Sequence, residues 1–344
     1  MGADRRGGRG RRARCRAGPR RAARALSVPV GRLQDAGAGR GRRHAAEERL
    51  RKDGPCPARR HPGGDRVSTA EHGAATGSPA DPGRAPGGAG TRAVRVTRDG
   101  SVLTVTIDRP ARRNAMTYAA WDELGAALNE AAAGDARVVV VTGTAGAFCS
   151  GGDLDGGDRA PHPHAQLAAV ARTCQTLVSL PQPTIAQVDG LAVGAGFGLA
   201  LACDFVVASS RARFGTMFLA RGLSPDFATS WLLPRLVGPR LATRLCLLPE
   251  IVDADRAREW GLLEEVVAPD ELPGHVAALA TRLAAGPPIA TRLTKQMLRD
   301  SWARGVEESL AAETMAQSIN RLSADAQEGI AAFLERRPAR FEGR

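Results

Sequence analysis

The order of apolar and polar positions predicts strands that alternate with helices. Residues 101–107, SVLTVTI, alternate aliphatic side chains with threonine, which is the period of a half-buried strand. Residues 138–142, VVVVT, are β-branched throughout, as in a strand that is covered on both faces. Between them, Thr117 opens a predicted helix. Its apolar stripe consists of Trp121, Leu124, Leu128 and Ala132.

The pattern continues in the same alternation. A helix is predicted over residues 166–179 and a strand in PTIAQVDG, residues 183–190. A glycine-rich turn and an apolar helix follow in residues 190–205, GLAVGAGFGLALACDF, and DFVVA returns as a strand. From Asp270 onward the pattern is helical. The fold class is therefore α/β, with layered strands and helices.

The first 93 residues differ in composition from the rest. They contain 22 Lys and Arg against 8 Asp and Glu, so the net charge of +12 arises entirely in this tail. The tail has no aromatic residue, and such a composition favours a disordered, low-complexity segment, including one translated from a start codon too far upstream. A basic arm for nucleic acid and a targeting peptide are the alternatives, but the stacking aromatics and the apolar region that they need are missing.

The cysteines and histidines show no ligand spacing. None of the six cysteines forms a CxxC pair, and without a secretory signal they are expected to be free thiols in a reducing, cytoplasmic compartment. Cys203 and Cys246 lie in apolar runs and are expected in the core. His162 and His164 stand between prolines in a polar loop with no acidic partner, so no metal is expected. No apolar run is long enough to span a membrane.

Two glycine-rich turns offer backbone N–H groups. In residues 190–205 the order strand, glycine turn, helix leaves unpaired donors at a helix start. The glycines form GxGxG rather than GxGxxG, and Asp204 comes too soon to hold a ribose, so a dinucleotide site is not favoured. Residues 147–154, AFCSGGDL, are expected to have the same architecture, with a helix start after the turn. Glycines that serve only close helix–sheet packing remain the structural alternative.

Two such turns on neighbouring strands can direct two N–H groups at one oxygen atom, which is an oxyanion hole. Ser150 is not a nucleophile-elbow serine, because GxSxG is missing and no histidine is placed to serve it.

Five segments in register resemble the crotonase family, also called the enoyl-CoA hydratase/isomerase family. They are RPARRNAM, AFCSGGDL, PTIAQVDGLAVGAGFGLALACDF, RFGTMFLARGLSPDFATSWLLPRLVG and AAFLERRPARFEGR. The resemblance covers residues 94–344. It implies a ββα-spiral acyl-CoA-binding core over residues 94–284 and C-terminal helices over 285–344 that form a trimer or a dimer of trimers. The implied partner is an acyl-CoA substrate, with no cofactor besides the CoA that it carries and no membrane or nucleic acid.

The resemblance also implies site residues. The two N–H donors to the thioester oxygen are carried onto Ser150 and Ala195. The candidates for contact with CoA phosphates are Lys295, Arg336, Arg337 and Arg113. The remaining expected substrate-binding residues are Ala115, Gly151, Gly152, Asp153, Leu154, Gly194, Met217, Phe218 and Trp231.

The two glutamates of the family's hydratases are missing. Their places fall on Gly198 and Phe218, which puts ordinary hydration in doubt because it needs an acid and a base. Asp226 occupies the place of the catalytic aspartate of dienoyl-CoA isomerases and of ring-type, phenylacetate-pathway isomerases. Apolar neighbours are expected to raise its pKa. The sequence therefore favours double-bond isomerisation by an aspartate proton shuttle. A hydratase, a catalytically weak acyl-CoA-binding paralogue and a helix-cap role for Asp226 remain open.

Overall fold

The computed structural model describes residues 92–155 and 162–344. Two β-sheets form the framework, and from β3 to β8 successive strands along the chain alternate between them. The first sheet has the strand order β1-β2-β3-β5-β7-β10, and the second has the order β4-β6-β8-β9. A strand of the first sheet, a strand of the second and a helix make one turn of a ββα spiral.

The first sheet is parallel except at one edge, where β1 and β2 pair antiparallel. Its third strand is buried on both faces, as its β-branched sequence predicts. The strands are β1 (Val94–Asp99), β2 (Val102–Ile107), β3 (Val138–Gly143), β5 (Thr184–Val188), β7 (Phe205–Ser209) and β10 (Glu265–Val267).

The second sheet is shorter, and three of its strands run parallel. Strand β6 pairs parallel with β4 and with β8, and β9 pairs antiparallel with β8 at the edge. The strands are β4 (Ala147–Cys149), β6 (Leu191–Val193), β8 (Arg213–Gly215) and β9 (Val252–Asp253). The carboxyl ends of the three parallel strands therefore meet at one edge, which is where ligands bind in α/β folds.

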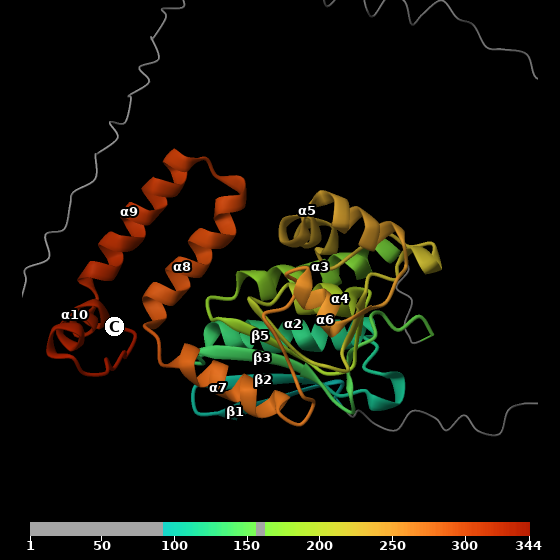
Figure 1. The fold of residues 1–344 in the computed structure, drawn as a ribbon, viewed down its shortest axis with the longest axis horizontal. Coiled ribbons are helices and arrows are strands. Elements are labelled where there is room, and N and C mark those ends of the chain that lie inside the picture. The colour runs from blue at the N-terminus through green and yellow to red at the C-terminus, as the bar shows by residue number, and fades with distance from the viewer. Residues whose placement is uncertain (1–91, 156–161) are drawn as a thin grey trace, which may run out of the picture. The chain divides into compact units, whose positions relative to one another are not determined.

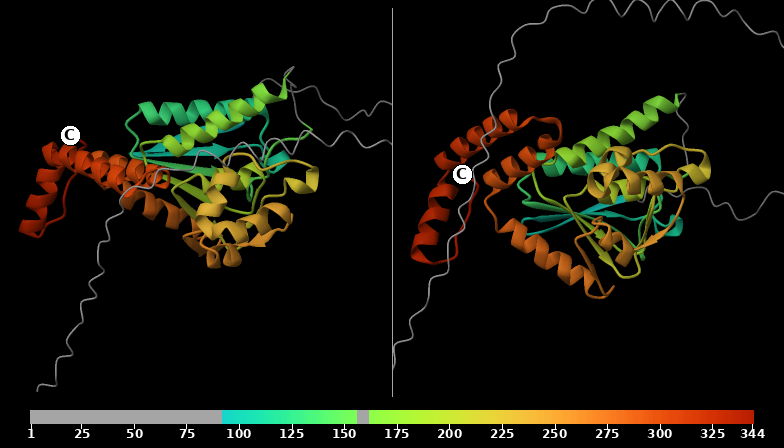
Figure 2. Two further views of the ribbon diagram at one scale, coloured as in Figure 1. Left: turned by 90° about the horizontal axis from the view of Figure 1, so that it is seen from above. Right: turned by 45° about the horizontal axis from the view of Figure 1, so that its top comes forward.

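Helices cover both faces of the first sheet. On one face α7 (Leu272–Ala284) packs against alternate residues of β3, β5 and β7. On the other face lie α2 (Tyr118–Ala133) and α3 (Pro163–Ser179), which pack side by side (Figures 1 and 2). The other helices of the core are α4 (Ala195–Leu201), α5 (Thr229–Leu247) and α6 (Ala254–Glu259), with 3-10 helices η2 (Pro110–Arg112) and η3 (Leu219–Arg221).

The chain ends in helices that leave apolar side chains exposed. They are α8 (Pro288–Asp300), η4 (Ser301–Ala303), α9 (Val306–Leu322) and α10 (Ala324–Glu335). Ile330, Phe333 and Leu334 of α10 are all exposed, Phe333 to 82%. The Arg137 guanidinium, at the amino end of β3, donates to the carbonyl oxygens of Ala284 (3.1 Å) and Phe341 (2.8 Å), so it joins this C-terminal region to the core.

Most predicted elements are confirmed. The Thr117 hydroxyl accepts the Ala120 N–H at 3.1 Å and caps α2, which begins at the predicted place. Two expectations in residues 147–154 are wrong: AFC is itself strand β4, and no helix begins at Leu154, because the chain bends there and α3 begins only at Pro163. The basic tail, residues 1–93, lies outside the described residues except for its last two positions.

Candidate active site

Three loops meet at the carboxyl edge of the second sheet. Residues 150–153 follow β4, Gly194 follows β6, and residues 216–218 follow β8. Because β4, β6 and β8 are neighbours and parallel, these loops lie together, as the two glycine-rich turns predict. The segment from Arg113 to Met116 joins them through backbone hydrogen bonds to the first loop.

The Ser150 N–H already has an acceptor. It donates to the carbonyl oxygen of Arg113 at 3.2 Å, and the Ser150 hydroxyl lies 3.3 Å from the Arg112 carbonyl oxygen. This N–H is therefore not free for a thioester oxygen, and the expectation of Ser150 as a donor is wrong for this reason. The Ser150 backbone instead holds the Arg113 loop against the turn.

The free amides of the two turns belong to Gly152 and Ala195. Gly152 forms a parallel bridge with Met116, in which the flanking residues Gly151 and Asp153 make the hydrogen bonds, so the Gly152 N–H points away from Met116. Ala195 is the first residue of α4, where an N–H has no intrahelical acceptor. Within residues 92–155 and 162–344, neither amide has a hydrogen-bond acceptor.

Left-handed backbone at Gly151 and Gly194 brings the two turns together. Their φ angles are 93° and 57°, which glycine adopts without strain. A Cβ atom on Gly151 would lie 3.6 Å from the Ala195 nitrogen and 3.0 Å from the Val193 carbonyl oxygen. The amides at the end of the first turn thus lie beside the amino terminus of α4, whose dipole favours negative charge.

Asp226 lies in a strained turn between η3 and α5. The two residues that follow it, Phe227 and Ala228, both have positive φ angles (46° and 56°), which non-glycine residues adopt at a cost of about 1–3 kcal/mol each. Such strain persists only where the surrounding structure holds it in place, and it is common at functional sites.

The surroundings of Asp226 are apolar. Its Oδ1 is buried without a hydrogen-bond partner, and burial raises the pKa of the carboxyl to about 6. Burial also raises the pKa values of the thiols of Cys149 and Cys174, and the Asp226 charge adds to both, so the carboxyl lies near the two sulfur atoms. The Phe227 ring packs on Trp121 of α2 at 4.9 Å between centroids.

Asp226 is also close to α4. Cys149 packs on the first turn of that helix, since a Cβ on Gly196 would lie 2.8 Å from the Cys149 Cβ. Phe227 packs two residues further along the helix, since a Cβ on Gly198 would lie 2.8 Å from the Phe227 carbonyl oxygen. The turn that carries Asp226 therefore borders α4, the helix whose first amide is that of Ala195.

The places of the two family glutamates are filled with apolar packing. Gly198 is closed by Phe227 and by Thr229, whose Oγ1 would lie 2.7 Å from a Cβ atom there. Phe218 is buried to 6% exposure, and its ring approaches Gly194. A carboxylate side chain at position 198 would displace Phe227 and Thr229, and the apolar Phe218 ring fills the second place.

The structure divides the other expected substrate-binding residues. Gly151, Gly194, Met217 and Phe218 lie at the loop edge, as does Ala115, while Leu154 is 64% exposed. The Asp153 carboxylate is buried, but ion pairs with Arg112 and Arg109, both at 3.0 Å, outweigh this burial and lower its pKa. Asp153 therefore fixes the arginine loop.

Trp231 is joined to the C-terminal helices. Its ring lies 4.7 Å from that of Trp302, and the Arg235 guanidinium lies over the Trp231 ring at 4.5 Å. Trp231 is the third residue of α5, so the amino-terminal turn of this helix contacts η4 as well as adjoining Asp226.

Lys295 lies away from the three loops of the candidate site. Its Nζ lies 2.6 Å from Asp204 Oδ2 and donates to the Gln182 carbonyl oxygen at 2.8 Å, at the amino ends of β5 and β7. The side chain is 13% exposed. The expectation that Lys295 contacts CoA phosphates is therefore wrong within this chain, because its charge is paired with Asp204 and it anchors α8.

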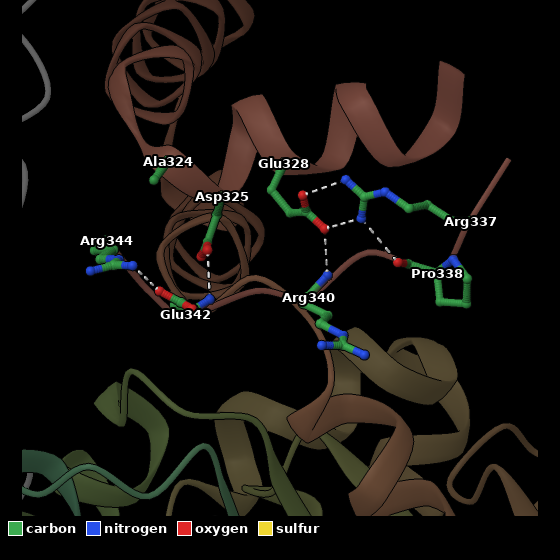
Figure 3. Close-up of a pocket in the computed structure, with 8 residues that line it drawn as sticks. All are labelled: Ala324, Asp325, Glu328, Arg337, Pro338, Arg340, Glu342 and Arg344. Carbon is green, nitrogen blue, oxygen red and sulfur yellow. Dashed lines mark hydrogen bonds and ion pairs between the residues drawn. The ribbon is translucent and has the colours of Figure 1, made fainter. Parts of the chain in front are cut away.

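Arg337 is likewise paired. It lines a cavity of about 560 Å³ together with Glu328 and Arg340 (Figure 3). The guanidinium binds Glu328 through two hydrogen bonds of 2.6 and 2.8 Å, which lower the pKa of that carboxyl to about 2. This arrangement leaves Arg337 little free charge for a phosphate.

The described residues contain no cluster of three or more ligating side chains that could hold a metal ion. His162 and His164 are exposed, with ring centroids 6.3 Å apart. Cys149, Cys174 and Cys203 are buried free thiols, and Cys246 is half-buried. No helix in the described part of the chain is long and apolar enough to cross a membrane.

The chain is a member of the enoyl-CoA hydratase/isomerase family, whose model matches residues 97–344. Members of this family act on CoA thioesters, and the free amide pair suits a thioester oxygen.

Individual relatives fall on both sides of the hydratase/isomerase division. The chain is 40% identical to a Rhodobacter capsulatus protein named "probable enoyl-CoA hydratase", over 71% of this chain and 95% of that one. It is 35% identical to the 1,2-epoxyphenylacetyl-CoA isomerase of Escherichia coli, with the same coverage. The crystal structure of an enoyl-CoA hydratase from Bacillus anthracis has a TM-score of 0.71 at 30% identity, covering 73% of this chain and all of that one.

Gly152 was expected among the substrate-binding residues but not as an N–H donor, and Thr229 was not singled out from the sequence. The Gly152 amide can be identified only from the bridge to Met116, and nothing in the residue order reveals it. The sequence shows Thr229 only as a threonine three residues after Asp226, and such a pair is also typical of a helix start.

Proposed function

We propose that this enzyme moves the double bond of an enoyl-CoA thioester. The N–H groups of Gly152 and Ala195 hold the thioester oxygen, and Asp226 transfers the proton. The observation that carries the proposal is the buried, unpaired Oδ1 of Asp226 beside the helix whose first amide is free.

In this reaction, the Asp226 carboxylate takes a proton from C2 of a 3-enoyl-CoA, and the electron pair of the C–H bond forms a dienolate whose negative oxygen accepts the two N–H bonds. Asp226 then returns the proton to C4, which gives the 2-enoyl-CoA. One group performs both transfers, so no second acid or base is needed. A pKa of about 6 suits a carboxyl that must both accept and donate a proton.

The first test uses Asp226→Asn with 3-hexenoyl-CoA in D₂O, monitored for 2-enoyl product and deuterium at C4. We expect a loss of at least about 10³-fold in kcat, because the amide cannot carry the proton. The matched control is Asp122→Asn, which changes an exposed aspartate of α2 and is expected to keep full turnover. Undiminished isomerisation by Asp226→Asn would exclude the proposed shuttle.

Hydration is the second candidate, since two of the three relatives reported above are named as hydratases. With Gly198 and Phe218 in the glutamate places, Asp226 is left to activate water and protonate C2 by itself. Incubating the enzyme with 2-enoyl-CoA and following loss of the conjugated double bond distinguishes the two reactions. A kcat/KM for hydration above that for isomerisation favours a hydratase, and binding without either reaction favours a catalytically weak paralogue.

We further propose that the C-terminal helices assemble the chain into a trimer or a dimer of trimers. The support is the row of exposed apolar side chains on α10, Ile330, Phe333 and Leu334, which is costly to leave in water. Sedimentation equilibrium of the full chain tests the assembly, and Phe333→Glu is expected to shift it toward monomer. A wild-type chain that is monomeric at micromolar concentration contradicts the assembly.

A further inference from the structure

Thr229 carries a second buried oxygen without a partner. The residue is 0% exposed, and its Oγ1 has neither donor nor acceptor in the described part of the chain. Its N–H donates to the Asp226 carbonyl oxygen at 2.9 Å, so the two residues belong to one turn. Both unpaired side-chain oxygens of this turn, Asp226 Oδ1 and Thr229 Oγ1, are therefore found within three residues.

An unpaired buried hydroxyl costs about 1–3 kcal/mol, and valine has almost the same shape without that cost. The Thr229 hydroxyl is therefore free to pair with a polar group that a ligand brings. Thr229 is the first residue of α5, where its own helix provides no carbonyl oxygen one turn earlier, so the usual intrahelical partner of a threonine hydroxyl is missing.

The Thr229 hydroxyl is directed at the helix that provides the Ala195 amide. Its Oγ1 would lie 2.7 Å from a Cβ on Gly198, and a Cβ points toward the amino terminus of its own helix. Ala195 and Gly198 are three residues apart, so they lie on one face of α4, separated by about 4.5 Å along the axis. The hydroxyl therefore lies about one helical turn from the amide that we assign to the thioester oxygen.

We propose that Thr229 is a specificity-determining residue that donates a hydrogen bond to an oxygen atom carried by the acyl group. This rests on the proposed function, since the acyl group is placed by the Gly152 and Ala195 amides. The substrate class is then an enoyl-CoA whose acyl part bears a hydroxyl, ether or epoxide oxygen beyond the thioester.

The test compares Thr229→Val and Thr229→Ser on matched substrates. The substrates are 3-hexenoyl-CoA and its 5-hydroxy and 6-hydroxy derivatives, each assayed for kcat/KM of isomerisation. We expect the wild-type enzyme to prefer at least one hydroxylated ester, and Thr229→Val to lower kcat/KM for that ester about tenfold while leaving 3-hexenoyl-CoA unchanged. Thr229→Ser retains the hydroxyl and is expected to retain the preference.

Thermal unfolding provides the control for folding. Thr229→Val is expected to unfold at the same or a higher temperature, because it removes an unpaired polar atom. An equal loss on all three esters, or no loss on any of them, overturns the proposal. Failure of the isomerase proposal is seen separately, as turnover of unsubstituted 3-hexenoyl-CoA that survives Asp226→Asn.

Discussion

The N–H of Ser150 donates to the carbonyl oxygen of Arg113 at 3.2 Å, and this bond separates the occupied amide of the turn from the free one. The bridge between Gly152 and Met116 turns the Gly152 N–H the other way, away from Met116. Ser150 and Gly152 are two residues apart in the same turn, but the Ser150 N–H is occupied and the Gly152 N–H is free.

Backbone ester substitution distinguishes these two amides, because it removes an N–H and keeps the side chain. Replacing Gly152 by glycolic acid through nonsense suppression is expected to lower kcat by about 10²–10³-fold, the usual loss for one oxyanion donor. The same replacement at Ser150, by its hydroxy-acid analogue, is expected to change kcat less than about fivefold and to lower stability by about 1 kcal/mol. A larger loss of kcat for the ester at Ser150 than for the ester at Gly152 would show that the Ser150 N–H is the donor.

Gly198 provides a test of the packing that replaces the glutamate. Gly198→Ala puts a methyl group 2.7 Å from Thr229 Oγ1 and 2.8 Å from the Phe227 carbonyl oxygen, so we expect a loss of about 1–3 kcal/mol in the free energy of unfolding. Gly274→Ala in α7 is the matched control: no atom lies within 4 Å of its Cβ, and helix propensity predicts a gain of about 0.5–1 kcal/mol. Urea unfolding measures both, and equal effects would contradict the close packing.

Asp226 is expected to make stability depend on pH. The folded state keeps this carboxyl protonated up to about pH 6, whereas the unfolded chain ionises it near 3.8, so its contribution to stability is present below pH 3.8 and is lost as pH rises through 6. Asp226→Asn removes the ionisation. Between pH 4 and pH 7 the free energy of unfolding of the variant is therefore expected to rise relative to that of the wild type, by up to about 3 kcal/mol.

Urea unfolding at a series of pH values measures this difference. Asp122→Asn, at an exposed position of α2, is the control and is expected to show no such rise. A constant difference between Asp226→Asn and wild type across this range would show that the carboxyl is not desolvated.

We expect Lys295 to contribute to the stability of the fold rather than to substrate binding. Lys295→Met leaves Asp204 without its cation and should lower the free energy of unfolding by about 1–3 kcal/mol, while KM for CoA esters stays within about twofold. Arg292→Met, at an exposed position of the same helix, is the control for both readouts. A KM that rises tenfold at unchanged stability would instead support a phosphate contact in the assembled enzyme.

The sequence alone predicted what depends on local pattern. Period-two alternation marked β2, uniform β-branching marked the doubly covered β3, and Thr117 marked the start of α2, because these signals arise within a few residues of the chain. The glycine-rich turns were also visible from residue type and spacing, whereas the missing glutamates and the lone Asp226 followed from the resemblance to the crotonase family. Strand β4 was missed because its three residues are too few to show a period.

The sequence by itself determined the α/β class and the two glycine-rich turns, and its resemblance to the crotonase family singled out Asp226 as the candidate carboxylate. The tertiary structure decided which amides are free, that Lys295 pairs with Asp204 instead of a phosphate, and that Thr229 lies against Gly198. The physical reason is that hydrogen-bond partners and burial are set by segments far apart in the chain. A bond from residue 150 to residue 113, or from residue 295 to residue 204, exists only after the strands have been placed side by side.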